Sequence, residues 1–425
     1  MTSTPTCCDD FQASALSRRR FLGGMAAAGA AGVATSLFGD AVRQASFAAS
    51  PGGNVMIVLS FRGGIDGLGM VVPHGDPAYY KARPGIGVSA DRLVAKDAMF
   101  GLHPKMQPLE WLWNSGELAA VQAVGLAQPN RSHFAAMEAV EDADPGSSLR
   151  QGWVNRMVGL DTDSSAREVV HLGGATPPTL IEGTAPSVAT KELGALELVG
   201  SKNGWAARRR AQLDTTWARA EGPLGNAARS ALETVDALGP LGAKAYKTAV
   251  RYPTAFPATD LSAALKDTAK LIKADVGTEV VSIDFGSWDM HSNYGTLETG
   301  EMTRMVGAFA ESVSAFMEDL GPLRSKVTLV TISEFGRRVQ ENGNRGLDHG
   351  WGNMMLVMGG GVRGGQYYGK WPGLGSVSQV DGDLKVETDY RAVLGEVVQK
   401  RFPQKDVTKV FPGFSPSPLG ILASA

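Results

Sequence analysis

Short continuous apolar runs recur along the chain and alternate with segments of helical periodicity. Runs of this kind are typical of strands that are buried on both faces of a parallel sheet. They lie at residues 54–60, 118–124, 279–285, 327–332 and 354–358. Helical patterns lie at residues 105–115, 135–140, 303–320 and 390–401. The alternation predicts a layered α/β fold with a mostly parallel central sheet.

A segment at about residues 205–275 has a different composition from the strand-rich parts. It is rich in Ala, Leu, Lys and Arg, and Gly-Pro pairs and Tyr252-Pro253 interrupt it. We interpret it as a helical insertion on the α/β core. Two forms of the insertion stay open, a cap or ordinary helices of the outer layer.

The N-terminus has the layout of an export signal. Arg18, Arg19 and Arg20 precede Phe21-Leu22, and residues 23–38 carry no charge. The paired arginines resemble the twin-arginine (Tat) signal, which a receptor reads as an address. The uncharged stretch is weakly apolar and shorter than the ~20 residues that a membrane-spanning helix needs. We therefore expect a Tat signal at residues 1–48, an α/β domain at 49–425, and a periplasmic or secreted protein that meets the membrane only during export.

Charge and cysteine content exclude several classes of function. The 425 residues include 41 Lys plus Arg and 43 Asp plus Glu, for a net charge of −2. This balance gives no electrostatic reason to expect nucleic acid as a partner. The two cysteines, Cys7 and Cys8, both lie in the expected signal. The rest of the chain therefore has no disulfide, no thiol nucleophile and no thiolate metal site.

Polar residues that can carry chemistry stand next to each apolar run. In open α/β sheets, ligands bind at the carboxyl ends of the strands, so these residues are the first candidates for a site. Carboxylates and neutral imidazoles are also ligands for divalent metals. The candidates in chain order are Asp66, Ser132, Asp289 with His291, Glu334, and Asp348 with His349.

Each candidate also has a structural interpretation. Asp66 could organise a glycine-rich turn. Glu334 could bind metal or could pair with Arg337. Ser132, at the start of an expected helix, could be a helix N-cap or a nucleophile. The remaining histidines stand beside Pro or Gly, and we expect them to be structural: His74, His103 and His171.

Several short motifs, spread over residues 54–401, carry a family resemblance. They include Arg62-Gly63-Gly64-Ile65-Asp66, Ser132-His133-Phe134, Trp288-Asp289-Met290-His291, Ser333-Glu334-Phe335-Gly336-Arg337 and Asp348-His349-Gly350-Trp351-Gly352-Asn353. Together they resemble the family known as domain of unknown function 1501, whose members are typically Tat-exported bacterial proteins. That family looks like a distant branch of the alkaline phosphatase and sulfatase superfamily. The resemblance implies a three-layer α/β/α fold with two metals and a hydroxyl nucleophile.

The resemblance also implies roles for individual residues. Asp66 would bind the second metal, Ser132 would be the nucleophile, and Asp289 and His291 would bind the first metal. An Asp-His pair of the superfamily falls on Glu334 and Phe335, and a last histidine falls on His349. Because Phe335 cannot bind metal, one imidazole is missing unless His133 or Asp348 replaces it. We therefore expect one or two divalent ions (Zn, Mn, Mg or Ca) and no nucleotide cofactor.

Two functions from different classes follow. The first is an exported metal-dependent hydrolase or transferase acting on a phospho- or sulfo-ester, with Arg62 or Arg337 holding the anionic oxygens. Formylglycine-type sulfatase chemistry is disfavoured, because Phe134 and Ala136 stand where that motif needs Pro and Arg. The second is a non-catalytic exported protein that uses the same fold to bind an envelope polymer or a partner protein.

Overall fold

A nine-stranded sheet forms the centre of this computed structural model, which describes residues 53–423 except 148, 162–163 and 199–203. Eight strands follow one another in the order β10-β4-β9-β8-β1-β7-β5-β6, and β13 pairs with β4. The expected export signal, residues 1–48, lies outside the described residues. The strands are β1 (Val55–Phe61), β4 (Leu118–Gly125), β5 (Val169–Leu172), β6 (Val188–Thr190), β7 (Val280–Phe285), β8 (Val327–Ile332), β9 (Asn353–Gly359), β10 (Gln366–Tyr368) and β13 (Thr388–Asp389).

Strand pairing is parallel except around β9. β1 pairs parallel with both β7 and β8, whereas β9 pairs antiparallel with β8 and β4. The five predicted apolar runs all form strands of this sheet, namely β1, β4, β7, β8 and β9. The prediction of a mostly parallel central sheet is confirmed. Because β9 runs antiparallel to β8 and β4, the residues that precede β9 lie at the edge of the sheet where β8 and β4 end.

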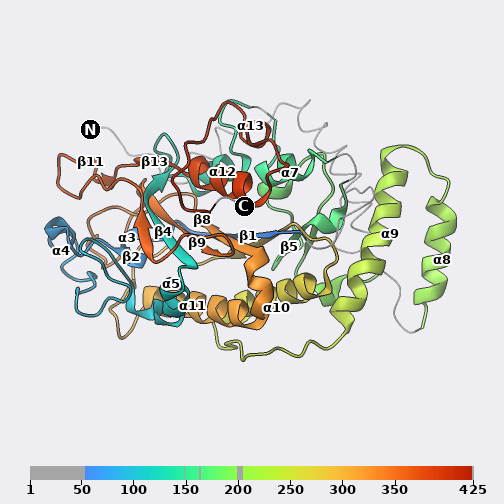
Figure 1. The fold of residues 1–425 in the computed structure, drawn as a ribbon, viewed down its shortest axis with the longest axis horizontal. Coiled ribbons are helices and arrows are strands. Elements are labelled where there is room, and N and C mark those ends of the chain that lie inside the picture. The colour runs from blue at the N-terminus through green and yellow to red at the C-terminus, as the bar shows by residue number, and fades with distance from the viewer. Residues whose placement is uncertain (1–52, 148, 162–163, 199–203, 424–425) are drawn as a thin grey trace.

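Helices cover both faces of the sheet and complete a three-layer α/β/α fold (Figure 1). Alternate residues of β1 point to opposite sides. Ile57 and Leu59 belong to the core cluster that contains Phe309, whereas Met56 and Val58 belong to the cluster that contains Trp153. The first face carries α5 (Glu110–Asn114), α10 (Ala258–Ala274) and α11 (Glu301–Leu320). The second carries α6 (His133–Asp142), α7 (Trp153–Val158), α12 (Tyr390–Arg401) and α13 (Val407–Val410).

The predicted insertion is helical in the described residues. It contains α8 (Ala206–Trp217), α9 (Gly222–Ala243) and α10. Helix α10 packs on α11 and belongs to the outer layer. Helices α8 and α9 extend from one end of the molecule, and α9 packs on α10 and on the 3-10 turn Leu193–Ala195 that follows β6 (Figure 1). They therefore lie beside the β5–β6 end of the sheet.

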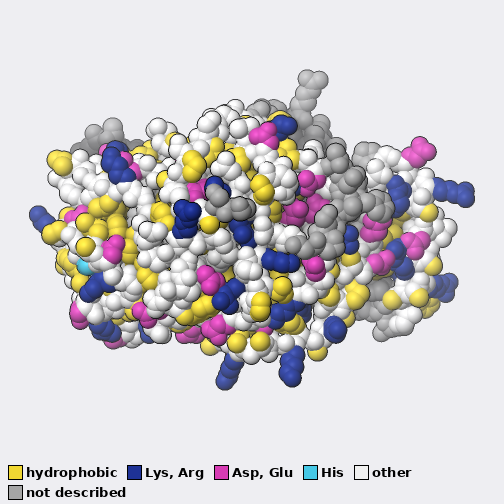
Figure 2. Space-filling view, viewed as in Figure 1, with side chains coloured by type: hydrophobic (Ala, Val, Ile, Leu, Met, Phe, Trp, Pro, Cys, Tyr) yellow, Lys and Arg dark blue, Asp and Glu magenta, His cyan; other side chains and the backbone are white. Residues whose placement is uncertain are grey.

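Smaller elements connect these layers. They are α3 (Gly67–Met70), β2 (Val71–Val72), α4 (Pro77–Ala82), β3 (Gly101–Leu102), β11 (Gln379–Val380), β12 (Asp383–Leu384) and 3-10 turns at Pro104–Leu109, Ala166–Glu168, Thr179–Ile181 and Gly321–Lys326. Within the described ranges, none of the helices has the length and apolar character needed to cross a membrane. Basic and acidic side chains are interspersed over the face shown in Figure 2, in keeping with the small net charge.

A candidate metal centre at the carboxyl end of the sheet

Four segments meet at the carboxyl end of the parallel strands. The loop after β7 carries Asp289 and His291, and the segment after β8 carries Glu334. Helix α6 begins at His133, shortly after β4 ends. His349 stands before β9, and the antiparallel direction of β9 brings it to the same edge.

Gly63 allows two of these segments to approach each other. Its φ is +111°, and a Cβ added to it would lie 2.8 Å from the backbone nitrogen of Asp289. A side chain at this position would therefore push the Asp289 loop away. The Gly63 N–H also donates to Oε1 of Glu334 at 2.8 Å, which joins the ends of β1 and β8.

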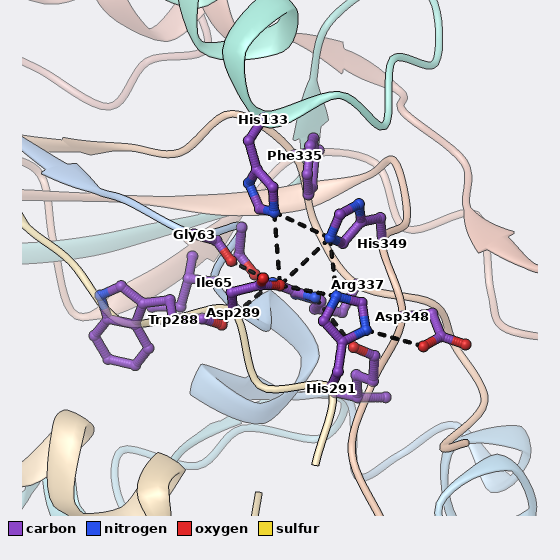
Figure 3. Close-up of polar contacts among 12 residues, drawn as sticks. Gly63, Ile65, His133, Trp288, Asp289, His291, Phe335, Arg337, Asp348 and His349 are labelled. Atoms are coloured by element: carbon purple, nitrogen blue, oxygen red, sulfur yellow. Dashed lines mark hydrogen bonds and ion pairs between the residues drawn. The ribbon is translucent and has the colours of Figure 1, made fainter. Parts of the chain in front are cut away.

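Three imidazole rings and one carboxylate point toward a common centre (Figure 3). Nε2 of His349 lies 3.0 Å from Nε2 of His133 and 3.0 Å from Nε2 of His291. Oδ1 of Asp289 lies 3.0 Å from Nε2 of His291, 3.3 Å from Nε2 of His349 and 3.6 Å from Nε2 of His133. In a tetrahedral zinc site with metal–ligand distances of about 2.0–2.1 Å, neighbouring donor atoms lie about 3.3 Å apart.

The outer nitrogen of each ring has its own acceptor. Nδ1 of His349 lies 2.9 Å from the carbonyl oxygen of Arg131, which can only accept, so this nitrogen carries the proton. Nδ1 of His133 lies 2.8 Å from Oε1 of Glu334, and Nδ1 of His291 lies 3.1 Å from Oδ1 of Asp348. Outer acceptors of this kind orient metal-binding histidines and fix their tautomer.

This arrangement of protons leaves three Nε2 lone pairs facing one another. Neutral rings protonated at Nδ1 cannot hydrogen-bond to each other through Nε2, and doubly protonated rings at these distances would repel. Burial, reinforced by the nearby charge of Arg337, lowers the pKa of His349 although the Arg131 carbonyl opposes the shift. A cation would satisfy these lone pairs, and the ligand atoms of His133, Asp289 and His349, which all lie within 4.8 Å of one another, could hold it, with Nε2 of His291 next to them. The residues present therefore fit a single metal ion.

Arg337 holds the carboxylate of the cluster in its ionised form. Its side chain is 1% exposed, and Nη2 lies 2.7 Å from Oδ1 of Asp289. Partial burial alone would raise the pKa of Asp289, but the hydrogen bond and charge of Arg337 outweigh it and lower that pKa. The other guanidinium hydrogen bonds go to the carbonyls of Gly63, Gly64, Trp288 and Leu347. We expected Arg337 to hold substrate oxygens, but its guanidinium is instead hydrogen-bonded to groups of the protein.

Glu334 and Asp348 lie one hydrogen bond outside the four donors. We predicted both as ligands, and the structure places each against the Nδ1 atom of a ring instead. Burial alone would raise the pKa of Glu334, but hydrogen bonds from His133 and from backbone amides lower it. The pKa of Asp348 is lowered chiefly by the hydrogen bond that Asn342 donates.

His133 is the donor that our sequence interpretation named only as a replacement for the missing imidazole. The position of that imidazole holds Phe335, whose ring packs against two of the rings of the cluster. The centroid of Phe335 lies 4.8 Å from that of His133 and 4.9 Å from that of His349. His133, Asp289 and His349 have ligand atoms that all lie within 4.8 Å of one another. The sequence signals for His133 were its place at the start of a helix after an apolar run and its presence in the motif Ser132-His133-Phe134.

Asp66 takes part in a different cluster. Its Oδ2 lies 2.6 Å from Nη1 of Arg83 and 2.6 Å from the hydroxyl of Tyr294, and its Oδ1 lies 2.9 Å from Nη2 of Arg83. All three side chains are buried. The carboxylate that we expected at a second metal is thus saturated by a bidentate arginine and a phenol.

The remaining candidates lie as follows. Arg62 contacts Oε1 of Glu141 at 2.6 Å and Oδ1 of Asp284 at 3.0 Å. Ser132 is the N-cap of α6, but its side chain makes no capping hydrogen bond, and its role as a nucleophile stays a prediction. Of the three histidines expected to be structural, Nδ1 of His103 accepts from the N–H of Lys105, and burial lowers the pKa of His103 to about 4. Nδ1 of His171 lies 3.2 Å from the hydroxyl of Ser282, and Nε2 of His74 lies 2.9 Å from the carbonyl of Asp97.

Comparison with known proteins identifies the family. The family model described as "Protein of unknown function (DUF1501)" matches residues 54–388, and the chain belongs to that family. No curated protein matches the sequence.

Among solved structures, the chain is similar to a protein in the alkaline phosphatase superfamily from Vibrio parahaemolyticus, with 10% identity over 78% of this chain and 66% of that chain and a TM-score of 0.34. It is also similar to the C-terminal periplasmic domain of EcEptC from Escherichia coli, in complex with Zn, with 10% identity over 88% and 91% and a TM-score of 0.37. A third is the sulfatase PsFucS1 from Pseudoalteromonas sp., with 12% identity over 88% and 72% and a TM-score of 0.33. The chain thus spans slightly less than two thirds of the Vibrio protein.

Proposed function

We propose that this member of the DUF1501 family is an exported metal-dependent hydrolase or transferase that acts on phospho- or sulfo-esters. The observation that carries the proposal is the cluster of three imidazole Nε2 atoms and the Asp289 carboxylate, in which the ligand atoms of His133, Asp289 and His349 all lie within 4.8 Å of one another. The side chains of Asp289 and His291 are 45% and 44% exposed, so the cluster is open to solvent on one side. A substrate could reach it there.

His133, His291, His349 and Asp289 would hold one metal ion. Imidazole nitrogen suits Zn²⁺ better than Mn²⁺, Mg²⁺ or Ca²⁺, which prefer oxygen ligands, so we favour Zn²⁺ among the four expected ions. Such an ion supplies Lewis acidity, which lowers the pKa of a water or hydroxyl and neutralises charge on the ester oxygens. We propose one ion rather than two, because Asp66 is saturated by Arg83 and Tyr294.

The surrounding residues fix the positions and the protonation of the four donor side chains. Arg337 keeps Asp289 ionised and fixed in position. Glu334, Asp348 and the carbonyl of Arg131 each keep a proton on Nδ1 of one ring, so that the Nε2 lone pairs face the centre. These contacts organise the four donors before any ligand binds, which is how outer hydrogen bonds raise metal affinity.

Ser132 is our candidate nucleophile. It directly precedes His133, is half-buried, and leaves its hydroxyl free of a capping bond at the start of a ten-residue helix. In this step the serine oxygen would bond to the phosphorus or sulfur, the bond to the leaving oxygen would break, the hydroxyl proton would pass to water, and the leaving alkoxide would take a proton from water. The helix N-terminus favours the anionic serine oxygen. Both chain neighbours of Ser132 contribute to the cluster, His133 through its ring and Arg131 through its carbonyl.

The test compares wild type with Ser132→Ala on aryl phosphate, phosphodiester and sulfate ester substrates, with Zn²⁺, Mn²⁺, Mg²⁺ or Ca²⁺ added after chelation. We expect activity that is highest with Zn²⁺ and that falls by several orders of magnitude in Ser132→Ala, because a covalent nucleophile is lost. Equal rates in the two proteins would exclude Ser132 as the nucleophile. Hydrolysis at the same rate with and without added metal would contradict the proposed metal-dependent function.

One observation favours the alternative of a non-catalytic binding protein. Four protein ligands saturate a tetrahedral ion, as in structural zinc sites, whereas catalytic sites keep a position open. The exposure of Asp289 and His291 opposes this interpretation, because it leaves room for a fifth ligand. A protein that holds its metal tightly and hydrolyses none of the esters would favour the alternative, with an envelope polymer or another exported protein as its partner.

Export to the periplasm or beyond is part of the proposal. The supporting feature is the pair Arg18-Arg19 ahead of Phe21-Leu22. Replacing Arg18 and Arg19 by lysine keeps the charge and removes the motif, so we expect the precursor to stay in the cytoplasm. Cell fractionation checks this, and normal export of the double variant would contradict it.

A further inference from the structure

The four donors of the metal cluster are not equivalent. The ligand atoms of His133, Asp289 and His349 all lie within 4.8 Å of one another, and we call these three residues the inner triad. Nε2 of His291 lies 3.0 Å from Nε2 of His349 and 3.0 Å from Oδ1 of Asp289, so it stands beside two members of the triad. The ring of His291 is also the most exposed of the three imidazoles, at 44% against 29% for His133 and 24% for His349.

Each member of the inner triad is attached to a buried side chain or to the backbone. The ring of His133 bonds through Nδ1 to the carboxylate of Glu334, which is 3% exposed. The ring of His349 donates to a backbone carbonyl, which cannot rotate away as a side chain can. The carboxylate of Asp289 accepts a hydrogen bond from the guanidinium of Arg337, which is 1% exposed. These three donors are therefore held by parts of the protein that are themselves fixed.

His291 is attached to a turn at the surface instead (Figure 3). Its Nδ1 lies 3.1 Å from Oδ1 of Asp348, a carboxylate that is 53% exposed. The side-chain amide of Asn342 donates to that same carboxylate oxygen and to the carbonyl oxygen of His291, each at 3.0 Å. Residues 343–345, which follow Asn342, are all exposed. One amide and one exposed carboxylate thus hold His291 in the cluster.

This asymmetry bears on how an anion enters the cluster. Four protein ligands fill a tetrahedral ion, whereas a catalytic site needs a position for its substrate. We propose that His291 is an exchangeable ligand that leaves the cluster when an oxyanion binds, and that Asn342 is the positioning residue that holds its ring in place. One donor leaves as another enters, so four ligands remain, and the released neutral ring hydrogen-bonds to water. This inference rests on the proposed function and states how access to its centre is regulated.

The experiment uses the mature protein loaded with Zn²⁺, with inorganic phosphate as the probe. Diethyl pyrocarbonate modifies neutral imidazole nitrogens that are accessible and free of metal, and peptide mass spectrometry measures the modification of each histidine. We expect phosphate to raise the modification rate of His291 about tenfold or more, because a state populated below about 10% becomes the major one. His133 and His349 should stay protected. His74, whose ring hydrogen-bonds to the carbonyl of Asp97, is the internal reference and should not respond to phosphate.

Two variants test the same inference without relying on the modification of wild type alone. His291→Ala should still bind about one Zn²⁺ per chain at saturating metal, with an affinity loss of at most about 100-fold, as for a change outside the fixed ligands. Its phosphate Kd, from isothermal titration calorimetry, should be lower than that of wild type, because no ring competes with the anion. Asn342→Ala keeps all four donors and should raise the modification rate of His291 without phosphate. Asn344→Ala is the matched control, since it keeps the backbone N–H that bonds to Asn342.

The outcomes separate this inference from the proposed function. Loss of the zinc ion from His291→Ala would overturn the inference, because the ring would then be a fixed ligand. Absence of phosphate binding by zinc-loaded wild type would overturn it too. If wild type hydrolyses esters and phosphate binds while His291 stays protected, phosphate is a fifth ligand, so the inference fails and the proposed function stands. If wild type hydrolyses no ester but phosphate releases His291, the inference is supported and the proposed catalysis fails.

Discussion

Asp66 and Asp289 each follow a central strand of the same sheet, and the structure gives them opposite surroundings. Asp66 is 3% exposed and accepts hydrogen bonds from Arg83 and Tyr294. Asp289 is 45% exposed and has one arginine contact, to Arg337, and three imidazole rings around it (Figure 3). In the sequence both are carboxylates close to a strand end, preceded by an apolar run.

The two carboxylates differ in whether an oxygen remains available to bind a metal ion. Both oxygens of Asp66 are used by the bidentate guanidinium, and its charge is neutralised inside a dry environment, so a metal would have to displace Arg83. Oδ1 of Asp289 faces the Nε2 atoms of three half-exposed imidazole rings, and the single hydrogen bond from Arg337 to this oxygen lowers the pKa of the carboxylate. A carboxylate thus becomes a metal-ligand candidate when its partners are incomplete and lone pairs converge on it.

The largest effect should come from removing one of the four donors. We expect Asp289→Ala and His349→Ala each to reduce the metal content from about one ion per chain to near zero, because the site loses a quarter of its ligands. Inductively coupled plasma mass spectrometry of purified protein measures this. His74→Ala is the control, since the ring of His74 hydrogen-bonds to the backbone carbonyl of Asp97, away from the cluster. Full metal content in both ligand variants would refute the assignment.

Asp66→Ala tests the other carboxylate and should act on stability instead. It leaves the guanidinium of Arg83 buried without its counter-charge, which typically costs about 3–5 kcal/mol of unfolding free energy. Urea denaturation measures the loss, and metal content should stay at the wild-type level. Asp66→Asn should cost less, because an amide oxygen can still accept hydrogen bonds. Loss of metal at unchanged stability would mean that Asp66 is a ligand after all.

A smaller effect is expected one hydrogen bond outside the cluster. Asp348→Ala removes the acceptor of the Nδ1–H of His291 and should weaken metal affinity about 10–100-fold while leaving the stoichiometry intact. Competition with a chelating dye measures the affinity. Asp91→Ala, at an exposed carboxylate, is the matched control. An affinity loss as large as that of His349→Ala would instead place Asp348 among the direct ligands.

The smallest expected effect is on the pH dependence of stability, and it concerns a third carboxylate, Glu141. Burial raises its pKa to about 7, although the charge of Arg62 opposes the shift. The folded protein then keeps this proton at pH values where the unfolded chain has lost it. The stability that Glu141 contributes is therefore present below its ordinary pKa of 4.5 and is lost as pH rises to about 7, by at most about 3 kcal/mol.

Glu141→Gln removes this titration. Urea midpoints of wild type and variant between pH 4 and 8, on chelated protein, give the difference, in which the histidine titrations common to both cancel. We expect the variant to gain stability relative to wild type as pH rises. Parallel curves would contradict the raised pKa.

The strands that could be predicted from the sequence are those of the centre of the sheet. β1, β4, β7, β8 and β9 read as continuous apolar runs because they are buried on both faces. We did not predict β5, β6 or β10. β5 has four residues and includes His171, and β6 and β10 have three residues each at the ends of the order, so their patterns are too short to stand out.

The sequence by itself determined the layered fold and the edge of the sheet at which polar residues gather, because burial imposes the apolar runs and parallel strands end together. For the same reason, the sequence identified Asp289, His291 and His349 as candidate metal ligands. Only the tertiary structure decided three contacts. His133 points into the cluster, Glu334 and Asp348 hydrogen-bond to the outer Nδ1 atoms of the rings, and Arg83 pairs with Asp66. These are contacts between side chains 17 to 216 positions apart, and their outcome depends on packing that no local pattern encodes.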